Sequence, residues 1–246
     1  KAVDPEKLGF TISWGDGEGI LRLLEQMAIK EGPGALLGLG VKRMAAELGV
    51  DSELAAHVKG LEVPMHDPRA FAGMALVYAT GPRGACHQRA DFYSLDLGVV
   101  RQECLGLKPG EDRFSIKGRV KDVVILQNVR EVDNALLRCT FASLPLDVTA
   151  GLLSLATGTS WTMEELLTVG ERSATLKRML NCKLGVTRSD DRLPRILKQP
   201  YREGSNAGVV PEETEHLDEY YTLRGWDRET GRPGQEKLKY LGLDII

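Results

Sequence analysis

The segment from residue 68 to residue 82, PRAFAGMALVYATGP, constrains the fold more than any other part of the chain. Its body is apolar and small, with alanine or glycine at positions 70, 72, 73, 75 and 79. Asp67 can serve as the N-cap with Pro68 at the first helical position, and Thr80-Gly81-Pro82 ends the helix. Because apolar residues dominate this helix, we expect it to be buried.

Helical patterns dominate the remaining sequence. Asp16 precedes an apolar stripe at i, i+3, i+4 and i+7 that starts at Ile20, and Gly32 follows it. Thr162 and Glu165 have the spacing of a capping box. We expect helices at 16–32, 35–48, 68–79, 117–141, 147–157, 161–180, 211–224 and 235–241, with an extended segment at 51–66 and polar connections at 180–197 and 200–211.

The fold class predicted from these patterns is mostly α and multihelical. No strand–helix–strand alternation occurs, and the glycine-rich GDGEG at 15–19 lacks the spacing of a phosphate-binding loop. The β-branched residues at 122–127 leave a strand there as the alternative, but the length of the surrounding pattern favours a helix. A domain boundary is expected near residue 56.

Composition excludes several classes of protein. The 246 residues are 42% hydrophobic and 27% charged, which is typical of a globular chain. A net charge of −3 gives no sign of nucleic-acid binding, and no apolar run approaches the roughly 18 residues of a membrane span. The four cysteines show no C-x-x-C spacing, so we expect no local metal motif. Four cysteines are also too few to stabilise 246 residues by disulfides, so we expect a reducing cytoplasm. Residue 1 is Lys rather than Met, so a fragment is expected.

Three long segments resemble one enzyme family. Residues 57–90, HVKGLEVPMHDPRAFAGMALVYATGPRGACHQRA, resemble the C-terminal region of the tungsten-containing aldehyde:ferredoxin oxidoreductases. Residues 14–49 are similar to the helical middle domain of that family, and residues 217–244 to its terminal helix and tail. The resemblance implies two helical domains here, with residues 1–56 as part of the middle domain and residues 57–246 as the C-terminal domain.

The resemblance also implies the cofactors. Members of the family hold a bis-pterin tungsten (or molybdenum) cofactor beside one [4Fe–4S] cluster. Three cluster cysteines and the β-rich domain under the pterins lie upstream in the family and are absent from this sequence. We therefore expect both cofactors to require that upstream region.

His87 is the candidate catalytic residue. The family has a histidine close to the metal at the matching position of the P-R-G-x-C-H motif, here residues 82–87. Oxidation of an aldehyde with water needs a proton acceptor near neutral pH, which an imidazole provides. The alternative is an ordinary histidine at a helix end.

Cys139 is the candidate metal ligand, because the resemblance places the fourth cluster cysteine in a D-x-x-G-L-C-like motif at the end of a helix. This sequence departs from that motif: Asn134 stands five residues before Cys139, Asp133 is one step earlier, and Leu137 replaces the glycine. Either Asn134 or Asp133 would meet a pterin. The alternative for Cys139 is a buried cysteine used for packing.

Arg89 completes the predicted site residues, as a guanidinium that could bind a pterin phosphate. A solvated arginine is its alternative. We expect Cys86, Cys104 and Cys182 to serve packing, and His57, His66 and His216 to be structural.

These residues predict the C-terminal part of an oxidoreductase that converts an aldehyde to a carboxylic acid and passes the electrons through the cluster to ferredoxin or an electron-transfer subunit. The part alone is expected to be inactive. We expect a small aldehyde as substrate, no nucleic-acid or membrane partner, and a homodimer as one possible assembly. The competing hypothesis is a helical subunit that binds a partner protein and has no redox activity.

Overall fold

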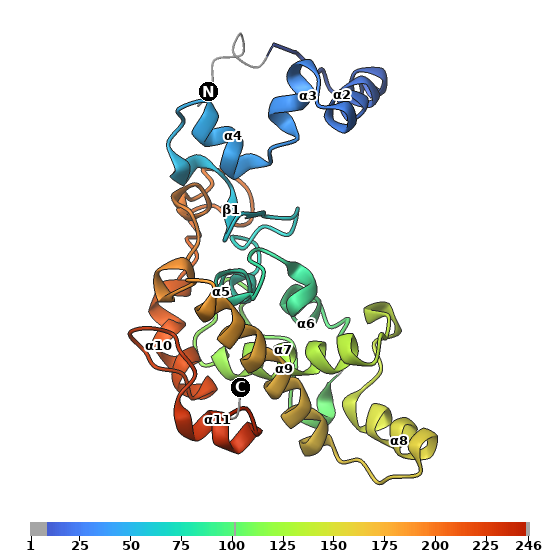
Figure 1. Ribbon diagram of the computed structural model, residues 1–246. Helices are drawn as coiled ribbons and strands as arrows, with labels where there is room; N and C mark the ends of the chain where they lie inside the picture. Colours follow the sequence, from blue (N-terminus) through green and yellow to red (C-terminus); the bar gives the residue numbers. More distant parts are fainter. Residues whose placement is uncertain (1–8, 101, 245–246) are drawn as a thin grey trace.

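The computed structural model describes residues 9–100 and 102–244 and confirms the mostly helical fold class (Figure 1). Within these residues the only sheet is a two-stranded antiparallel hairpin, in which His57 pairs with Glu62 and Val58 with Leu61. The α-helices are α2 (Gly17–Ile29), α3 (Gly32–Leu37), α4 (Val41–Glu47), α5 (Ala72–Thr80), α6 (Phe92–Asp96), α7 (Val120–Ala135), α8 (Leu146–Thr157), α9 (Met163–Lys183), α10 (Glu213–Arg224) and α11 (Gln235–Leu241). The strands are β1 (His57–Val58) and β2 (Leu61–Glu62).

Helix α5 lies at the centre of the main core. All nine of its residues are buried, as the apolar composition of the segment predicts. It packs against α6, α7 and α10, while α7 and α9 run against each other (Figure 1). The close approach of α7 and α9 depends on Gly170, because a Cβ there would lie 2.1 Å from the carbonyl oxygen of Asn128.

The helices α2, α3 and α4 gather at one end of the molecule (Figure 1). The single helix expected at 35–48 is wrong, because Gly40 adopts a φ of +76° and separates α3 from α4. Side chains at η1 (Ser52–Leu54) tie this end to the rest, since Glu53 forms an ion pair with Arg192 at 2.5 Å. The domain boundary near residue 56 stays a prediction.

Helix α5 begins four residues later than the sequence predicts. Asp67 does not cap it; its carboxylate accepts hydrogen bonds from the backbone and side chain of Arg69 within a turn. Arg69 also donates to the carbonyl oxygen of Gln199 at 2.8 Å and stacks over Tyr201. Asp67 and Pro68 therefore form a turn that leads into the helix, and the N-cap position belongs to Phe71.

Helix α7 is shorter than the predicted helix at 117–141, although its helical state over 122–127 is confirmed. It ends at Ala135, and Leu137 then adopts a left-handed φ of +53°. Cys139 consequently lies beyond the helix, before the 3₁₀ turn η4 (Thr140–Ala142). The expectation that the thiol sits on the end of a long helix is therefore wrong.

Other local predictions agree with the structure. Thr162 and Glu165 form a reciprocal capping box at the start of α9. Helix α9 continues to Lys183, so the polar connection begins later than residue 180. The segment after α9 contains the 3₁₀ turns η5 (Arg188–Asp190) and η6 (Arg195–Lys198). No helix among residues 9–100 and 102–244 is long and apolar enough to cross a membrane.

Candidate functional site

The segment that carries His87 is held by α9 and by the β1–β2 hairpin after it leaves α5. Asn181 of α9 donates a hydrogen bond to the carbonyl oxygen of Pro82 at 2.6 Å. Gly84 has a φ of +98°, and a Cβ there would lie 2.0 Å from the carbonyl oxygen of Val58 in β1. A side chain at position 84 would therefore push the segment off the hairpin. These contacts fix the path of the chain just before His87.

A buried ion-pair cluster fixes the hairpin itself. Lys59 lies 2.7 Å from the fully buried carboxylate of Asp191 and donates to the carbonyl oxygen of Ala79 at the end of α5. Asp191 also forms an ion pair with Arg178 of α9 at 2.9 Å, and it accepts a hydrogen bond from the hydroxyl of Tyr221 in α10. Burial lowers the pKa of Lys59, and Asp191 opposes that shift. The cluster thus joins the hairpin, the end of α5, α9, α10 and the segment that carries Asp191.

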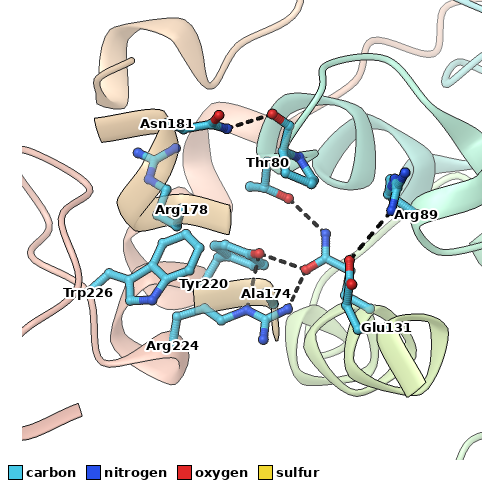
Figure 2. A pocket seen from close by; sticks show the side chains of 11 residues that line it. Thr80, Arg89, Glu131, Ala174, Arg178, Asn181, Tyr220, Arg224 and Trp226 are labelled. Carbon is cyan, nitrogen blue, oxygen red and sulfur yellow. Dashed lines mark hydrogen bonds and ion pairs between the residues drawn. The ribbon is translucent and has the colours of Figure 1, made fainter. Parts of the chain in front are cut away.

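A narrow polar cavity lies between α5, α7, α9 and α10 (Figure 2). Gln127 donates to Thr80 at 3.1 Å, and its carbonyl oxygen accepts from Tyr220 and Arg224 at 2.6 Å each. The free volume of the cavity is about 20 Å³, enough for about one water molecule. The hydrogen bonds of Gln127 thus connect α7 to α5 and α10, and the cavity is too small for an organic substrate.

His87 begins the 3₁₀ turn η2 (His87–Arg89) and is half-buried. Burial lowers its pKa, and the neighbouring His66, Arg130 and Arg83 lower it further, while Asp91 opposes them. The amide nitrogen of Gln88 lies 3.0 Å from Nε2 of His87. An amide nitrogen only donates, so with this assigned amide orientation Nε2 accepts and a neutral ring carries its proton on Nδ1. A neutral imidazole is the form that can accept a proton.

His66 is the residue that the sequence analysis missed. We expected it to be structural, but its ring centroid lies 4.7 Å from that of His87. His66 also stacks on Tyr93 of α6, with centroids 4.3 Å apart and planes 11° apart. The only indication in the sequence that the two histidines could meet was their position, since His66 precedes α5 by six residues and His87 follows it by seven.

A chain of buried charges connects the His87 segment to the end of α7. Asp91, four residues after His87, pairs with Arg130 of α7. Arg130 lies 4.0 Å from Asp133, and Asp133 pairs with Arg138 beside Cys139. Burial raises the pKa of both Asp91 and Asp133, while the arginines oppose the shift. Spacing in the sequence does not predict these ion pairs, except for Arg130 and Asp133, which lie on one face of the same helix.

The structure separates the two candidates for pterin contact. Asp133 is buried and engaged by Arg138, whereas Asn134 is exposed on the last turn of α7. Arg89 lies 3.7 Å from Glu131, and its Nε is buried without a hydrogen-bond partner. Buried atoms without a partner also occur on Asp91, Arg130 and Arg138. Polar groups around this end of α7 are therefore left unsatisfied by the described residues.

Cys139 is exposed, so no described residue of this chain buries it as a packing cysteine would be buried. Cys86 is buried, as expected, and its sulfur accepts from Arg83 at 3.1 Å. Cys104 is exposed, so its expected packing role is wrong, and Cys182 is half-buried. Within the described parts of the chain, no three His, Cys, Asp or Glu side chains gather closely enough to hold a metal ion. Cys139 could thus supply one thiolate to a cluster whose other ligands come from elsewhere.

Comparisons with known proteins agree with the resemblance in the sequence. Residues 2–243 match the model of a family described as aldehyde ferredoxin oxidoreductase, domains 2 and 3. The tungsten-containing aldehyde ferredoxin oxidoreductase of Pyrococcus furiosus is 35% identical over 98% of this chain and 40% of its own length. The corresponding protein of Thermococcus kodakarensis is 34% identical over 94% of this chain and 37% of its own length. The chain thus spans about 40% of the length of these relatives.

Two further similarities are more distant. The aliphatic sulfonate oxidoreductase, WOR-like subunit, of Pyrococcus furiosus is 27% identical over 97% of this chain and 36% of its own length. A chain of the active site complex BamBC of benzoyl coenzyme A reductase, solved with 1,5-dienoyl-CoA, superposes with a TM-score of 0.68. That chain is 23% identical over 98% of this chain and 42% of its own length, so the likeness concerns the fold alone. The family match over residues 2–243 and the 35% identity carry the assignment: the chain belongs to the aldehyde ferredoxin oxidoreductase family and corresponds to its domains 2 and 3.

Proposed function

We propose that this chain is the C-terminal part of a tungsten (or molybdenum) pterin enzyme that oxidises an aldehyde to a carboxylic acid and delivers the electrons through a [4Fe–4S] cluster to ferredoxin. The observation that carries the proposal is the environment of His87, whose pKa is lowered by burial at the end of a segment fixed by α9 and the hairpin. The relatives named as tungsten-containing aldehyde ferredoxin oxidoreductases support the substrate class and the metal.

The reaction requires proton transfer as well as electron transfer. An aldehyde and one water yield a carboxylate, two electrons and three protons. The pterin-bound metal supplies two-electron acceptance when it is bound. His87 accepts one of the protons, because an imidazole that is neutral at pH 7 is a competent base. We place the substrate channel along α5 and the segment that follows it.

The residues at the end of α7 fit the implied cofactors. The exposed thiol of Cys139 would hold one iron of the cluster, since a thiolate is the usual ligand of iron in such clusters. Asn134 would hold a pterin, because its amide is exposed whereas Asp133 is already engaged by Arg138. The unsatisfied nitrogens of Arg89, Arg130 and Arg138 suit the phosphate charge of that pterin, although Glu131 already lies beside Arg89.

Partners and location follow from the same proposal. We propose ferredoxin or an electron-transfer subunit as the electron acceptor, a cytoplasmic location, and a homodimer as the assembly. A small aldehyde is the proposed substrate. The related aliphatic sulfonate oxidoreductase indicates that substrates differ within the wider family. Because the chain spans about 40% of the length of its relatives, we propose that this chain alone is inactive.

Metal analysis of the protein made from the whole gene and purified without oxygen tests the proposal. We expect about four iron atoms per polypeptide, one tungsten or molybdenum, and aldehyde-dependent reduction of ferredoxin. A colourless protein that lacks all three metals when produced with tungstate and molybdate supplied would contradict the proposal. It would favour the helical subunit that only binds a partner.

A further inference from the structure

Two histidines that are 21 positions apart in the sequence meet beside the candidate active site. The rings of His66 and His87 have centroids 4.7 Å apart and planes tilted by 54°. Tyr93 stacks on the ring of His66, and the hydroxyl of Tyr78 donates to the carbonyl oxygen of His66 at 2.8 Å. Both the ring and the backbone of His66 are therefore fixed, which holds it against His87.

The charged groups around the pair come from several elements. Arg83 from the preceding segment and Arg130 from α7 disfavour a proton on His87, and Asp91 at the start of α6 favours one. Asp91 also faces His66, but its carboxylate is paired with Arg130 and buried. The phenols of Tyr93 and Tyr78 also contact His66, at its ring and at its backbone carbonyl respectively. Asp91 is thus a carboxylate that interacts with both rings, but it is already engaged by Arg130.

We propose that His66 and His87 take up one proton between them, and that His66 is the positioning residue that keeps the ring of His87 available as a proton acceptor. Two protonated imidazoles at this separation repel each other in a half-buried site, so a proton on one ring disfavours a proton on the other. His66 contacts the ring of His87, and Nε2 of His87 takes a proton when the Gln88 amide turns its oxygen toward that nitrogen or moves away. The functional part of this inference rests on the role proposed for His87.

The test measures proton binding to each histidine separately in the protein made from the whole gene. Exchange of the ring C2 hydrogen for deuterium, followed by mass spectrometry over a range of pH, reports the protonation of single histidines. Trypsin cleavage after Lys59, Arg69, Arg83 and Arg89 places His66 in peptide 60–69 and His87 in peptide 84–89. The two curves can therefore be followed independently, and no substrate is needed.

His66→Gln removes the charge of His66 and leaves a polar side chain. We expect the curve of the His87 peptide to move to higher pH, because a neighbouring positive charge that opposed protonation is lost. In the reciprocal variant, His87→Gln, the curve of peptide 60–69 should move in the same direction, since coupling between two sites is mutual. His57→Gln is the matched control, a histidine of β1, and should leave both curves in place.

A pH profile of turnover provides the functional measurement. In His66→Gln, kcat/KM on the acid limb should fall about three- to ten-fold while the plateau at higher pH is kept. A lowered plateau with an unmoved limb would indicate a purely structural role. His66→Phe, which keeps an aromatic ring on Tyr93, replaces His66→Gln if that variant unfolds.

The two proposals can fail separately. Curves for peptides 60–69 and 84–89 that do not respond to the neighbouring substitution, in variants with native melting temperatures, would overturn the coupled pair. Coupled curves in a protein whose turnover is indifferent to His87 would retain the pair and overturn the role proposed for His87 in aldehyde oxidation.

Discussion

The His87 and Cys139 regions differ in how much of their environment this chain provides. His87 follows a fully buried helix and is surrounded by side chains from α6, α7 and the segment before α5. Cys139 is exposed beyond the end of α7, among side chains such as Leu137 and Phe141 that are 92% and 90% exposed. The first region is preformed by this chain, whereas the second presents groups that other parts of a longer protein would have to cover.

The largest expected effect concerns the preformed region. In the protein made from the whole gene, His87→Ala should lower turnover by about two to four orders of magnitude, the usual contribution of a positioned acid or base. His57→Ala serves as the control and should keep turnover near the wild-type value. Steady-state kinetics with an aldehyde measure both variants. Near-normal turnover in His87→Ala would remove this imidazole from the mechanism.

The Cys139 region should respond in its metal content. Cys139→Ser should remove most of the iron, about four atoms per polypeptide, because one of the four thiolates is lost. Cys104→Ser is the matched control, since Cys104 is exposed as well but lies in the 3₁₀ turn η3 (Glu103–Leu105). Iron analysis and visible absorption are the measurements. Equal iron in both variants would leave Cys139 as an ordinary surface thiol.

Two glycines within helices compare the packing of the two regions. A Cβ at Gly73 of α5 would lie 2.1 Å from the ring of Phe92, so Gly73→Ala should cost about 1–3 kcal/mol of unfolding free energy. Gly151 of α8 has open space around it, so Gly151→Ala should stabilise the protein by up to about 1 kcal/mol. Chemical denaturation measures both. Similar losses in the two variants would contradict the difference in packing.

The smallest effect is expected at the turn before Cys139. Leu137 adopts a φ of +53°, which costs an ordinary residue about 1 kcal/mol or more. Leu137→Gly should therefore raise the unfolding free energy by less than about 1 kcal/mol, since glycine loses part of the gain through backbone entropy. Leu136→Gly, at a φ of −83°, should instead lower it. If both variants lose the same stability, the left-handed turn carries no strain.

Local sequence patterns predicted most of the helices because their signals lie within a few residues. Thr162 and Glu165 identified the start of α9, and the small apolar residues of α5 identified a buried helix. Errors occurred where a left-handed backbone conformation or a competing local hydrogen bond intervened. Gly40 split one expected helix, and Asp67 bonded Arg69 within a turn instead of capping α5.

The sequence by itself determined the helical fold class, the burial of α5 and the motif that contains His87. Only the tertiary structure decided that His66 lies against His87 and that Asp91 pairs with Arg130. The physical reason is the distance along the chain over which each kind of interaction acts. Helix periodicity and capping depend on neighbours three or four positions away, whereas the charge and proton affinity of a site depend on whichever distant segments packing brings together.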